Sequence, residues 1–320
     1  MNQKKKIVIL GGGNGGSISI RAMKSYVDHY SIFAVIGVSD SGSTSGKIRR
    51  ELGVLPPGDL VRAILAMSSY DYDMLKHIFY DNRYSGPGKL HKFAIGHLFL
   101  GLAEQYNGGV IDAIRAFEQA VDALGTVFPV TLDLTDLCAE LTNGEVIKGE
   151  HEIDEPNWDR AVKIARAWID PVVDIYEEAR NALREADYII LGPGSFYTSI
   201  VATLLPNGVK EAIEQSKAKL IFVAGNTIER NGETGPLSTS ELVTALHTYL
   251  PRRLDMVVSN TVVLTPSQEK MYLERQWERI TIDHEKLDVP VIASPFEFTG
   301  TGLDPKKLGE LLHTYITTHT

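Results

Sequence analysis

Residues 5–16 read Lys-Lys-Ile-Val-Ile-Leu-Gly-Gly-Gly-Asn-Gly-Gly, a short apolar run that ends in a glycine-rich loop. Residues 36–46 repeat this pattern as Ile-Gly-Val-Ser-Asp-Ser-Gly-Ser-Thr-Ser-Gly. Glycine lets backbone N–H groups turn toward an anion, and the positive end of a following helix adds to them. Two such loops at the ends of successive strands would face one crevice. The sequence therefore predicts a site for a phosphorylated ligand.

The order of the elements along the chain predicts an α/β fold. Nearly continuous apolar runs, typical of strands buried on both faces of a parallel sheet, occur at Ile7–Leu10, Ile32–Val38, Tyr188–Leu191, Leu220–Val223 and Met256–Val258. Helical patterns occur at Ile18–Tyr30, Asp59–Met67, His97–Tyr106, Trp158–Arg184 and Gly208–Ser216. We expect a doubly wound, mostly parallel Rossmann-like sheet with helices on both faces, in one domain over residues 1–320.

The middle of the chain interrupts this alternation. Residues 126–150 alternate apolar and polar side chains around Thr142-Asn143-Gly144, which is a hairpin signal. We expect a small antiparallel insertion over residues 126–150, followed by a long amphipathic helix at Trp158–Arg184. That helix, or the C-terminal segment, could form a contact in a homodimer, but packing on the chain's own sheet explains its pattern equally well.

Composition excludes several classes of protein. The chain has 320 residues, of which 41 are acidic and 32 basic, and its formal net charge of −9 argues against nucleic acid as a partner. Cys138 is the single cysteine, so neither an intrachain disulfide nor a thiolate metal cluster is possible. No apolar run approaches the ~20 residues of a membrane span. The basic N-terminus leads directly into a strand rather than a secretory core, so we expect a cytoplasmic protein.

The first loop also fits a dinucleotide fingerprint. Gly11-x-Gly13-x-x-Gly16 follows a strand and opens a helix, and Asp40 ends the next strand, where a ribose-binding carboxylate is expected. An NAD-dependent oxidoreductase is therefore one hypothesis. A ribose-binding carboxylate is not normally set in a second glycine-rich loop, however. That second loop favours another phosphate or a sugar.

A proline-containing loop follows the second glycine-rich loop. It reads Leu52-Gly53-Val54-Leu55-Pro56-Pro57-Gly58-Asp59. Asp59 can be the N-cap of the next helix or part of the site. Arg49 and Arg50 lie just before this loop and could reach a phosphate, with a solvated helix face as the alternative.

Three later strands end in the same kind of residue. Gly192-Pro193-Gly194-Ser195 follows the third apolar run, Asn226-Thr227 the fourth and Ser259-Asn260 the fifth. Ligands of open α/β sheets bind outside the carboxyl ends of the strands. We therefore expect these ligand-binding residues in the loops at and near the strand ends: Gly12, Gly13, Asn14, Gly15, Asp40, Ser41, Gly42, Ser43, Ser45, Gly46, Arg49, Asp59, Gly192, Gly194, Ser195, Thr198, Asn226, Thr227 and Asn260.

These loops, in this order, resemble the gluconeogenesis factor family, within the 2-phospho-L-lactate transferase superfamily. The resemblance covers most of the chain and is strongest in the two N-terminal glycine-rich loops, the proline-containing loop, Leu191–Ser199, and Asn226 with Gly232-Glu233-Thr234. It implies binding of a UDP-sugar such as UDP-N-acetylglucosamine and a role in cell shape and envelope synthesis during gluconeogenic growth. The transferase branch implies magnesium-dependent transfer of a phospholactyl group from a guanosine diphosphate-linked donor.

The sequence departs from the family at several of these positions. Ser39 stands where the family carries a second acid, so Asp40 is the one candidate ligand for Mg²⁺ in that loop. The resemblance implies two further ligand-binding residues, His97 and Tyr272. His97 replaces an amide of the family, with simple packing at a helix start as the equal alternative. Tyr272 matches a tyrosine linked with UDP-sugar binding. The C-terminal Gly302-Leu303-Asp304-Pro305 lacks the family's arginine.

Three functions follow, in order of preference. The first is a nucleotide-sugar-binding regulatory protein, because the strand-end loops offer many backbone and hydroxyl hydrogen-bond donors. The sequence also contains few obvious catalytic groups: no Ser-His-Asp set, no HExxH motif and no cluster of metal-binding histidines. The second is a Mg²⁺-dependent phosphoester transferase, a chemistry that needs mainly positioning and charge neutralisation. The NAD-dependent oxidoreductase comes last. The sequence assigns no catalytic residue and leaves open whether the protein is an enzyme.

Overall fold

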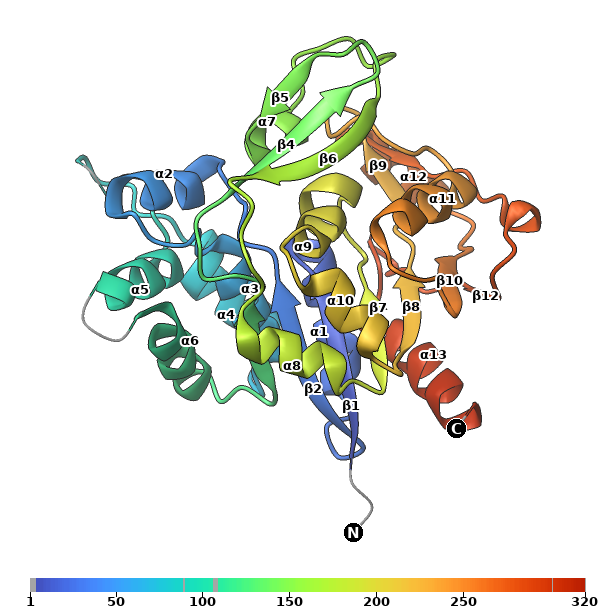
Figure 1. The fold of residues 1–320 in the computed structure, drawn as a ribbon, viewed down its shortest axis with the longest axis horizontal. Coiled ribbons are helices and arrows are strands. Elements are labelled where there is room, and N and C mark those ends of the chain that lie inside the picture. The colour runs from blue at the N-terminus through green and yellow to red at the C-terminus, as the bar shows by residue number, and fades with distance from the viewer. Residues whose placement is uncertain (1–3, 89, 106–108, 301, 320) are drawn as a thin grey trace.

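The computed structural model describes residues 4–319, apart from residue 89, residues 106–108 and residue 301. Seven strands form one parallel sheet in the order β12-β10-β8-β7-β1-β2-β3, with helices on both of its faces (Figure 1). The strands are β1 Lys5–Gly11, β2 Tyr30–Ile36, β3 Thr126–Pro129, β7 Tyr188–Leu191, β8 Lys219–Val223, β10 Met256–Asn260 and β12 Val291–Ser294. The predicted α/β fold with a mostly parallel, doubly wound sheet is confirmed.

The direction of chain progression reverses next to β1. From β1 the chain moves outward through β2 to β3, then returns to β7 on the other side of β1 and continues through β8 and β10 to β12. Ligands of doubly wound sheets bind outside the carboxyl ends of the strands at such a reversal. The loops after β1, β2 and β7 lie at this point, and they are the glycine-rich loops of the sequence.

The central strands are fully buried. Ile7, Val8, Ile9 and Leu10 are each at most 1% exposed, and β1 pairs with β2 on one side and β7 on the other. Burial of each such side chain contributes about 1.5–3 kcal/mol. The near-continuous apolar runs of the sequence reflect this burial on both faces of the sheet.

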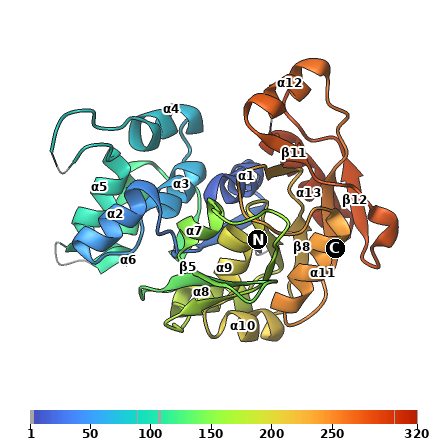
Figure 2. The ribbon, with the colours of Figure 1, turned by 90° about the horizontal axis from the view of Figure 1, so that it is seen from above.

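Several helices pack against one another beside the sheet. The α1 helix (Gly13–Lys24) packs against α3 (Gly58–Met67) and α13 (Pro305–Thr318), and α8 (Glu177–Arg184) packs against α10 (Val209–Gln215). Seen from above, the helices from α2 to α6 lie on the opposite side of the molecule from α12 and β11 (Figure 2). The remaining elements are α2 Ser43–Leu52, α4 Tyr72–Lys76, the π-helix η1 His77–Asp81, α5 Ile95–Ala103, α6 Gly109–Ala120, the π-helix η3 Phe196–Val201, α9 Ala202–Leu204, β9 Thr227–Glu229, α11 Thr239–Tyr249, α12 Pro266–Glu274, β11 Trp277–Arg279 and the 3₁₀ helix η4 His284–Lys286. Tyr106, at the expected end of the His97–Tyr106 helix, lies outside the described residues.

The antiparallel insertion begins and ends later than expected. Residues 126–129 form β3, which pairs in parallel with β2 and so belongs to the main sheet. The small sheet consists of β4 (Asp136–Leu141), β5 (Val146–Lys148) and β6 (Ile164–Asp170), and the short helix α7 (Glu150–Asp154) follows β5. The predicted hairpin turn at residues 142–144 joins β4 and β5 and is confirmed.

The expected long helix at Trp158–Arg184 is wrong. Its first half contains β6, which pairs antiparallel with β4, and a helix begins only at Glu177. Pro171 interrupts the pattern, because proline within a helix removes a hydrogen bond and its ring clashes with the preceding turn. The homodimer contact suggested for a helix over residues 158–184 is therefore ruled out in that form. Across the described ranges, each helix is too short or too polar to cross a bilayer.

Candidate functional site

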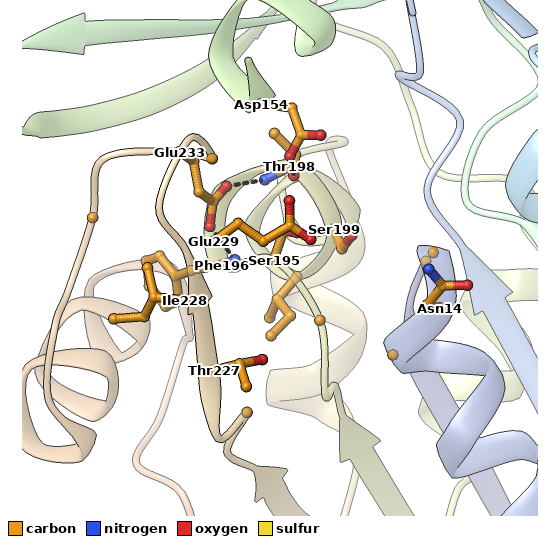
Figure 3. A pocket seen from close by; sticks show the side chains of 18 of the residues that line it. Asn14, Asp154, Ser195, Phe196, Thr198, Ser199, Thr227, Ile228, Glu229 and Glu233 are labelled. Atoms are coloured by element: carbon orange, nitrogen blue, oxygen red, sulfur yellow. Dashed lines mark hydrogen bonds between the residues drawn. The ribbon is translucent and has the colours of Figure 1, made fainter. Parts of the chain in front are cut away.

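A cavity of about 470 Å³ opens at the carboxyl ends of the strands next to the topological reversal. The strand-end loops that contribute to its lining include those after β1, β2, β7 and β8. In the close-up, Asn14 at the start of α1 faces a wall formed by Ser195, Thr198 and Glu229 across the open space (Figure 3). The cavity has the size of a small-molecule site.

The loop after β1 forms the floor of the cavity. Helix α1 begins at Gly13, and its N-cap residue Gly12 makes no side-chain cap hydrogen bond. The first N–H groups of a helix lack intrahelical partners, and the helix dipole favours an anion there. A Cβ on Gly15 would lie 2.2 Å from the carbonyl oxygen of Pro193, so only glycine lets this loop approach the loop after β7.

The loop after β2 presents a second uncapped helix start and a carboxylate. Helix α2 begins at Ser43, and its N-cap Gly42 has no side-chain cap bond. Asp40 lines the cavity and accepts the Gly42 N–H at 2.9 Å. Burial, and next the charge of Asp59, raise the pKa of Asp40 to about 6. A half-buried carboxyl with a raised pKa beside a second acid is typical of a functional site.

Helix α7 of the insertion contacts the loop after β2 and the π-helix η3 after β7. The His151 N–H donates to Ser41 Oγ at 3.1 Å, and the Thr198 hydroxyl donates to Asp154 at 3.3 Å. The small sheet above this helix is seen at the top of Figure 1. Burial and the neighbouring Asp40 and Asp154 raise the pKa of Glu150 to about 9. The insertion therefore brings acidic side chains to a site otherwise built by the main sheet.

The loop after β7 is bound by the chain's own carboxylate. Glu233 accepts the backbone N–H groups of Phe196, Tyr197 and Thr198, the last at 3.0 Å (Figure 3). Burial, followed by the charge of Asp154, raises the pKa of Glu233 to about 7. These three N–H groups, which begin η3, already have an anionic partner.

A buried hydrogen-bond network holds three of the amide and tyrosine side chains expected at the site. The Glu297 carboxylate accepts hydrogen bonds from Asn226 at 2.6 Å, Asn260 at 2.9 Å and Tyr272 at 2.6 Å. Asn226 also lines the cavity, whereas Asn260 and Tyr272 do not. The network joins the loops after β8 and β10, so Asn260 and Tyr272 are placed behind the cavity wall.

Two other expected site residues point away from the cavity. Arg49 forms an ion pair with Asp136 at 2.8 Å and donates to the Thr135 carbonyl at 2.9 Å, which ties α2 to the insertion. His97 is 1% exposed and its Nδ1 lies 3.2 Å from Thr44 Oγ1. Burial, followed by the charge of Arg83, lowers the pKa of His97 to about 3.

The structure brings together most of the predicted positions. Those that line the cavity are Gly12, Gly13, Asn14, Gly15, Asp40, Gly42, Asp59, Gly194, Ser195, Thr198, Asn226 and Thr227. Those that do not are Ser41, Ser45, Gly46, Arg49, His97, Gly192, Asn260 and Tyr272. Ser43 begins α2, and its side chain is outside the described part. Asp59 is not a helix cap, because α3 begins at Gly58 with Pro57 as its N-cap.

Sequence reasoning missed several cavity residues. They are Arg62, Tyr80, Glu150, Asp154, Ser199, Glu229, Glu233 and Trp277. Arg62 follows Asp59 by one helical turn, and this spacing could have placed both at one site. Glu150 lies in α7 and Tyr80 in η1, outside the strand-end loops. Nothing in the sequence around either residue indicated that these segments lie at the cavity.

The comparison with protein families identifies the fold as a known one. The model of the family described as 2-phospho-L-lactate transferase CofD matches residues 7–297. The chain belongs to this family. A Thermotoga maritima relative is 36% identical over 293 residues, which cover 91% of this chain and 90% of that one. The gluconeogenesis factor of Listeria innocua is 34% identical over 304 residues, covering 94% and 91% of the two chains.

A solved structure is closely similar to this chain in fold. It is a member of the UPF0052 family from Bacillus halodurans, with a TM-score of 0.88 and 28% identity. The alignment covers 98% of this chain and 100% of the neighbour. This neighbour and the chain therefore share the fold across nearly their full lengths.

The acidic side chains of the cavity bear on whether it could hold a metal. Over residues 4–319, apart from the gaps named above, no group of three or more His, Cys, Asp or Glu side chains is arranged around a single metal position. Mg²⁺ is commonly held by one or two carboxylates together with the phosphates of a substrate. Asp40 and Asp59 both line the cavity, so they could hold Mg²⁺ together with the phosphates of a bound ligand.

Proposed function

We propose that this protein binds a nucleotide-sugar of the UDP-sugar type in the cavity at the carboxyl ends of the strands. The observation that carries the proposal is the pair of uncapped helix starts, at Gly12 and Gly42, that line one cavity together. Each supplies backbone N–H groups for one phosphate, so a diphosphate suits the pair. Asn226 and Thr227 supply further polar groups for the remainder of the ligand.

Family membership supports a regulatory role for this binding. Relatives across most of the chain carry the name gluconeogenesis factor, and the resemblance noted in the sequence implies support of cell shape and envelope synthesis during growth on gluconeogenic carbon sources. We place this role in the cytoplasm, in keeping with a lone cysteine that is buried and unpaired.

Isothermal titration calorimetry tests the proposal. UDP-N-acetylglucosamine, GDP and NADH would each be titrated into the protein, with and without Mg²⁺. We expect binding of UDP-N-acetylglucosamine. With Mg²⁺ present, Asp40→Asn should weaken it at least about tenfold, because Asp40 is the candidate ligand for a cation that would neutralise the diphosphate. Asp136→Asn, which alters a carboxylate outside the cavity, is the control. Binding of NADH alone, or unchanged affinity in Asp40→Asn, would overturn the proposal.

The second candidate function is Mg²⁺-dependent transfer of a phosphoester group from a nucleoside-diphosphate-linked donor. The neighbouring carboxyls of Asp40 and Asp59 favour it, because each raises the local negative charge that a cation would neutralise. Mg²⁺, when bound, would stabilise charge on the departing diphosphate. Tight GDP binding that requires Mg²⁺ and is lost in Asp40→Asn would favour this function over the first.

A further inference from the structure

The cavity presents an electrostatic problem for an anionic ligand. Seven carboxyl-bearing side chains line it, at positions 40, 59, 150, 154, 155, 229 and 233. Among the described lining residues, Arg62 is the one lysine or arginine. A diphosphate at this site would therefore meet one fixed cationic side chain, and the position of that side chain decides where the ligand's charge can be neutralised.

Arg62 lies directly over the first glycine-rich loop. Its Nη1 is 3.6 Å from the point where a Cβ on Gly13 would sit, at the start of α1. The guanidinium and the free N–H groups of the helix start thus lie side by side at the cavity floor. This combination of a planar cation and backbone N–H groups suits a phosphate, which arginine can bind through two parallel hydrogen bonds.

The guanidinium keeps unused hydrogen-bonding capacity. Nη1 lies 3.5 Å from Asp59 Oδ1, a long contact, and Nη2 donates to the Tyr80 hydroxyl. Within the described part of the chain, the buried Nε of Arg62 has no hydrogen-bond partner. Buried polar groups of native proteins nearly always have one. Nη1, which faces the first loop and among the described residues has only the long contact to Asp59, is the donor left for an anion bound there.

Tyr80 holds the Arg62 guanidinium through a ring contact and the hydrogen bond from Nη2. Its ring lies 4.4 Å from Arg62 Cζ and 5.3 Å from Arg83 Cζ, and its edge meets His97 at 5.1 Å. Tyr80 belongs to the π-helix η1, a rare element that is frequent at functional sites. Arg83 in turn donates to Thr44 Oγ1 at 2.5 Å, in the first turn of α2. One aromatic ring therefore links the cation over the first loop to the start of the second.

We propose that Arg62 binds the diphosphate of the ligand at the first loop, and that Tyr80 is a positioning residue that holds its guanidinium there. That the ligand carries a nucleoside rests on the proposed function. Binding of its phosphate groups by Arg62 is argued from the geometry of the cavity alone. The inference predicts that Arg62 contributes to the affinity for phosphate groups and not to the affinity for the nucleoside.

Binding of UDP, uridine and inorganic pyrophosphate to the wild type and to variants tests the inference. We expect Arg62→Ala to lower the affinity for UDP and pyrophosphate about tenfold to a hundredfold, the loss of one charged hydrogen-bonding group, with uridine unaffected. Arg62→Lys should recover part of the loss, because lysine keeps the charge without the planar fork. Tyr80→Leu should weaken both phosphate compounds about tenfold or less, and again spare uridine.

Arg21→Ala is the matched control. Arg21 also stacks on a tyrosine, with its Cζ 4.4 Å from the Tyr72 ring, but neither residue lines the cavity. Its loss should leave all three affinities within about twofold. An Arg62→Ala protein that binds UDP and pyrophosphate like the wild type would overturn the inference, as would an equal loss for uridine. A wild type that binds pyrophosphate but neither UDP nor a UDP-sugar would reject the proposed function and keep Arg62 as an anion-binding residue; a wild type that binds none of these compounds would reject both.

Discussion

The Glu233 carboxylate accepts the backbone N–H of Thr198 at 3.0 Å, and the same carboxylate also accepts those of Phe196 and Tyr197. A side chain from the segment after β9 thus satisfies the N–H groups that begin η3. In other glycine-rich loops, such groups bind a phosphate. The loop after β7 is therefore set apart from those after β1 and β2, whose helices begin without a side-chain cap.

Glu233→Ala should destabilise the protein by about 2–4 kcal/mol, because it leaves three backbone N–H groups without their acceptor. Chemical denaturation measures the free energy of unfolding. Glu155→Ala is the control, since Glu155 also lines the cavity but is exposed. Equal stability of the two variants would mean that the carboxylate of Glu233 does not hold this loop.

The buried acids should make the protein less stable as pH rises. Folding raises the pKa of Glu150 from 4.5 to about 9 and that of Asp40 from 3.8 to about 6. Between the unfolded and folded values, the native state binds protons that the unfolded state has released, so the free energy of unfolding falls with increasing pH. The decline should begin near pH 4 and continue toward pH 9.

Glu150→Gln should remove the part of this decline that is due to Glu150. At pH 4 the variant and the wild type should be about equally stable, because the carboxyl is protonated in both states. At pH 8 the variant should be more stable by on the order of 1–3 kcal/mol. Glu152→Gln, on the exposed side of the same helix, should leave the pH profile unchanged. A Glu150→Gln profile parallel to that of the wild type would contradict the assignment.

Gly15→Ala should disrupt the contact between the first and third loops. The added Cβ would lie 2.2 Å from the carbonyl oxygen of Pro193, closer than any real contact, and both partners are backbone. We expect a loss of about 2–4 kcal/mol of stability, as for other overpacked sites. Gly225→Ala is the control, because Gly225 also lines the cavity but nothing lies within 4 Å of its added Cβ. Equal melting temperatures of the two variants would refute the close approach.

The sheet could be predicted from the sequence because its strands are buried on both faces. Runs such as Tyr188–Leu191 have no polar residue to obscure the pattern, and the glycine-rich loops that follow them mark the carboxyl ends. The insertion was harder to predict. In β6, outward-facing residues such as Arg166 alternate with buried ones irregularly, and Pro171 was the one local signal against a helix.

The parts of the site that could be predicted are those carried by the strand ends themselves. Asp40 and Gly12 lie in loops whose position follows from the sheet topology. Tyr80, Glu150 and Glu233 come from segments between the strands, and they reach the cavity only because those segments fold back over it. Tertiary packing of this kind leaves no periodicity in the local sequence.

Tyr272→Phe should separate a structural from a ligand-binding role for this tyrosine. Its buried hydroxyl donates to Glu297 at 2.6 Å and accepts from Asn226 at 2.9 Å. Removing it should cost about 1–3 kcal/mol of stability, since one buried carboxylate loses a donor. Because Tyr272 does not line the cavity, the affinity for UDP-N-acetylglucosamine should change less than about threefold.

Thermal denaturation and calorimetry on the same preparations provide both measurements. Tyr70→Phe is the control for stability, because the Tyr70 side chain is 55% exposed and its hydroxyl loss should cost little. A Tyr272→Phe protein that melts like the wild type but binds the nucleotide-sugar tenfold more weakly would place the hydroxyl on the ligand. In that case the Asn226–Glu297–Tyr272 network would have to open during binding.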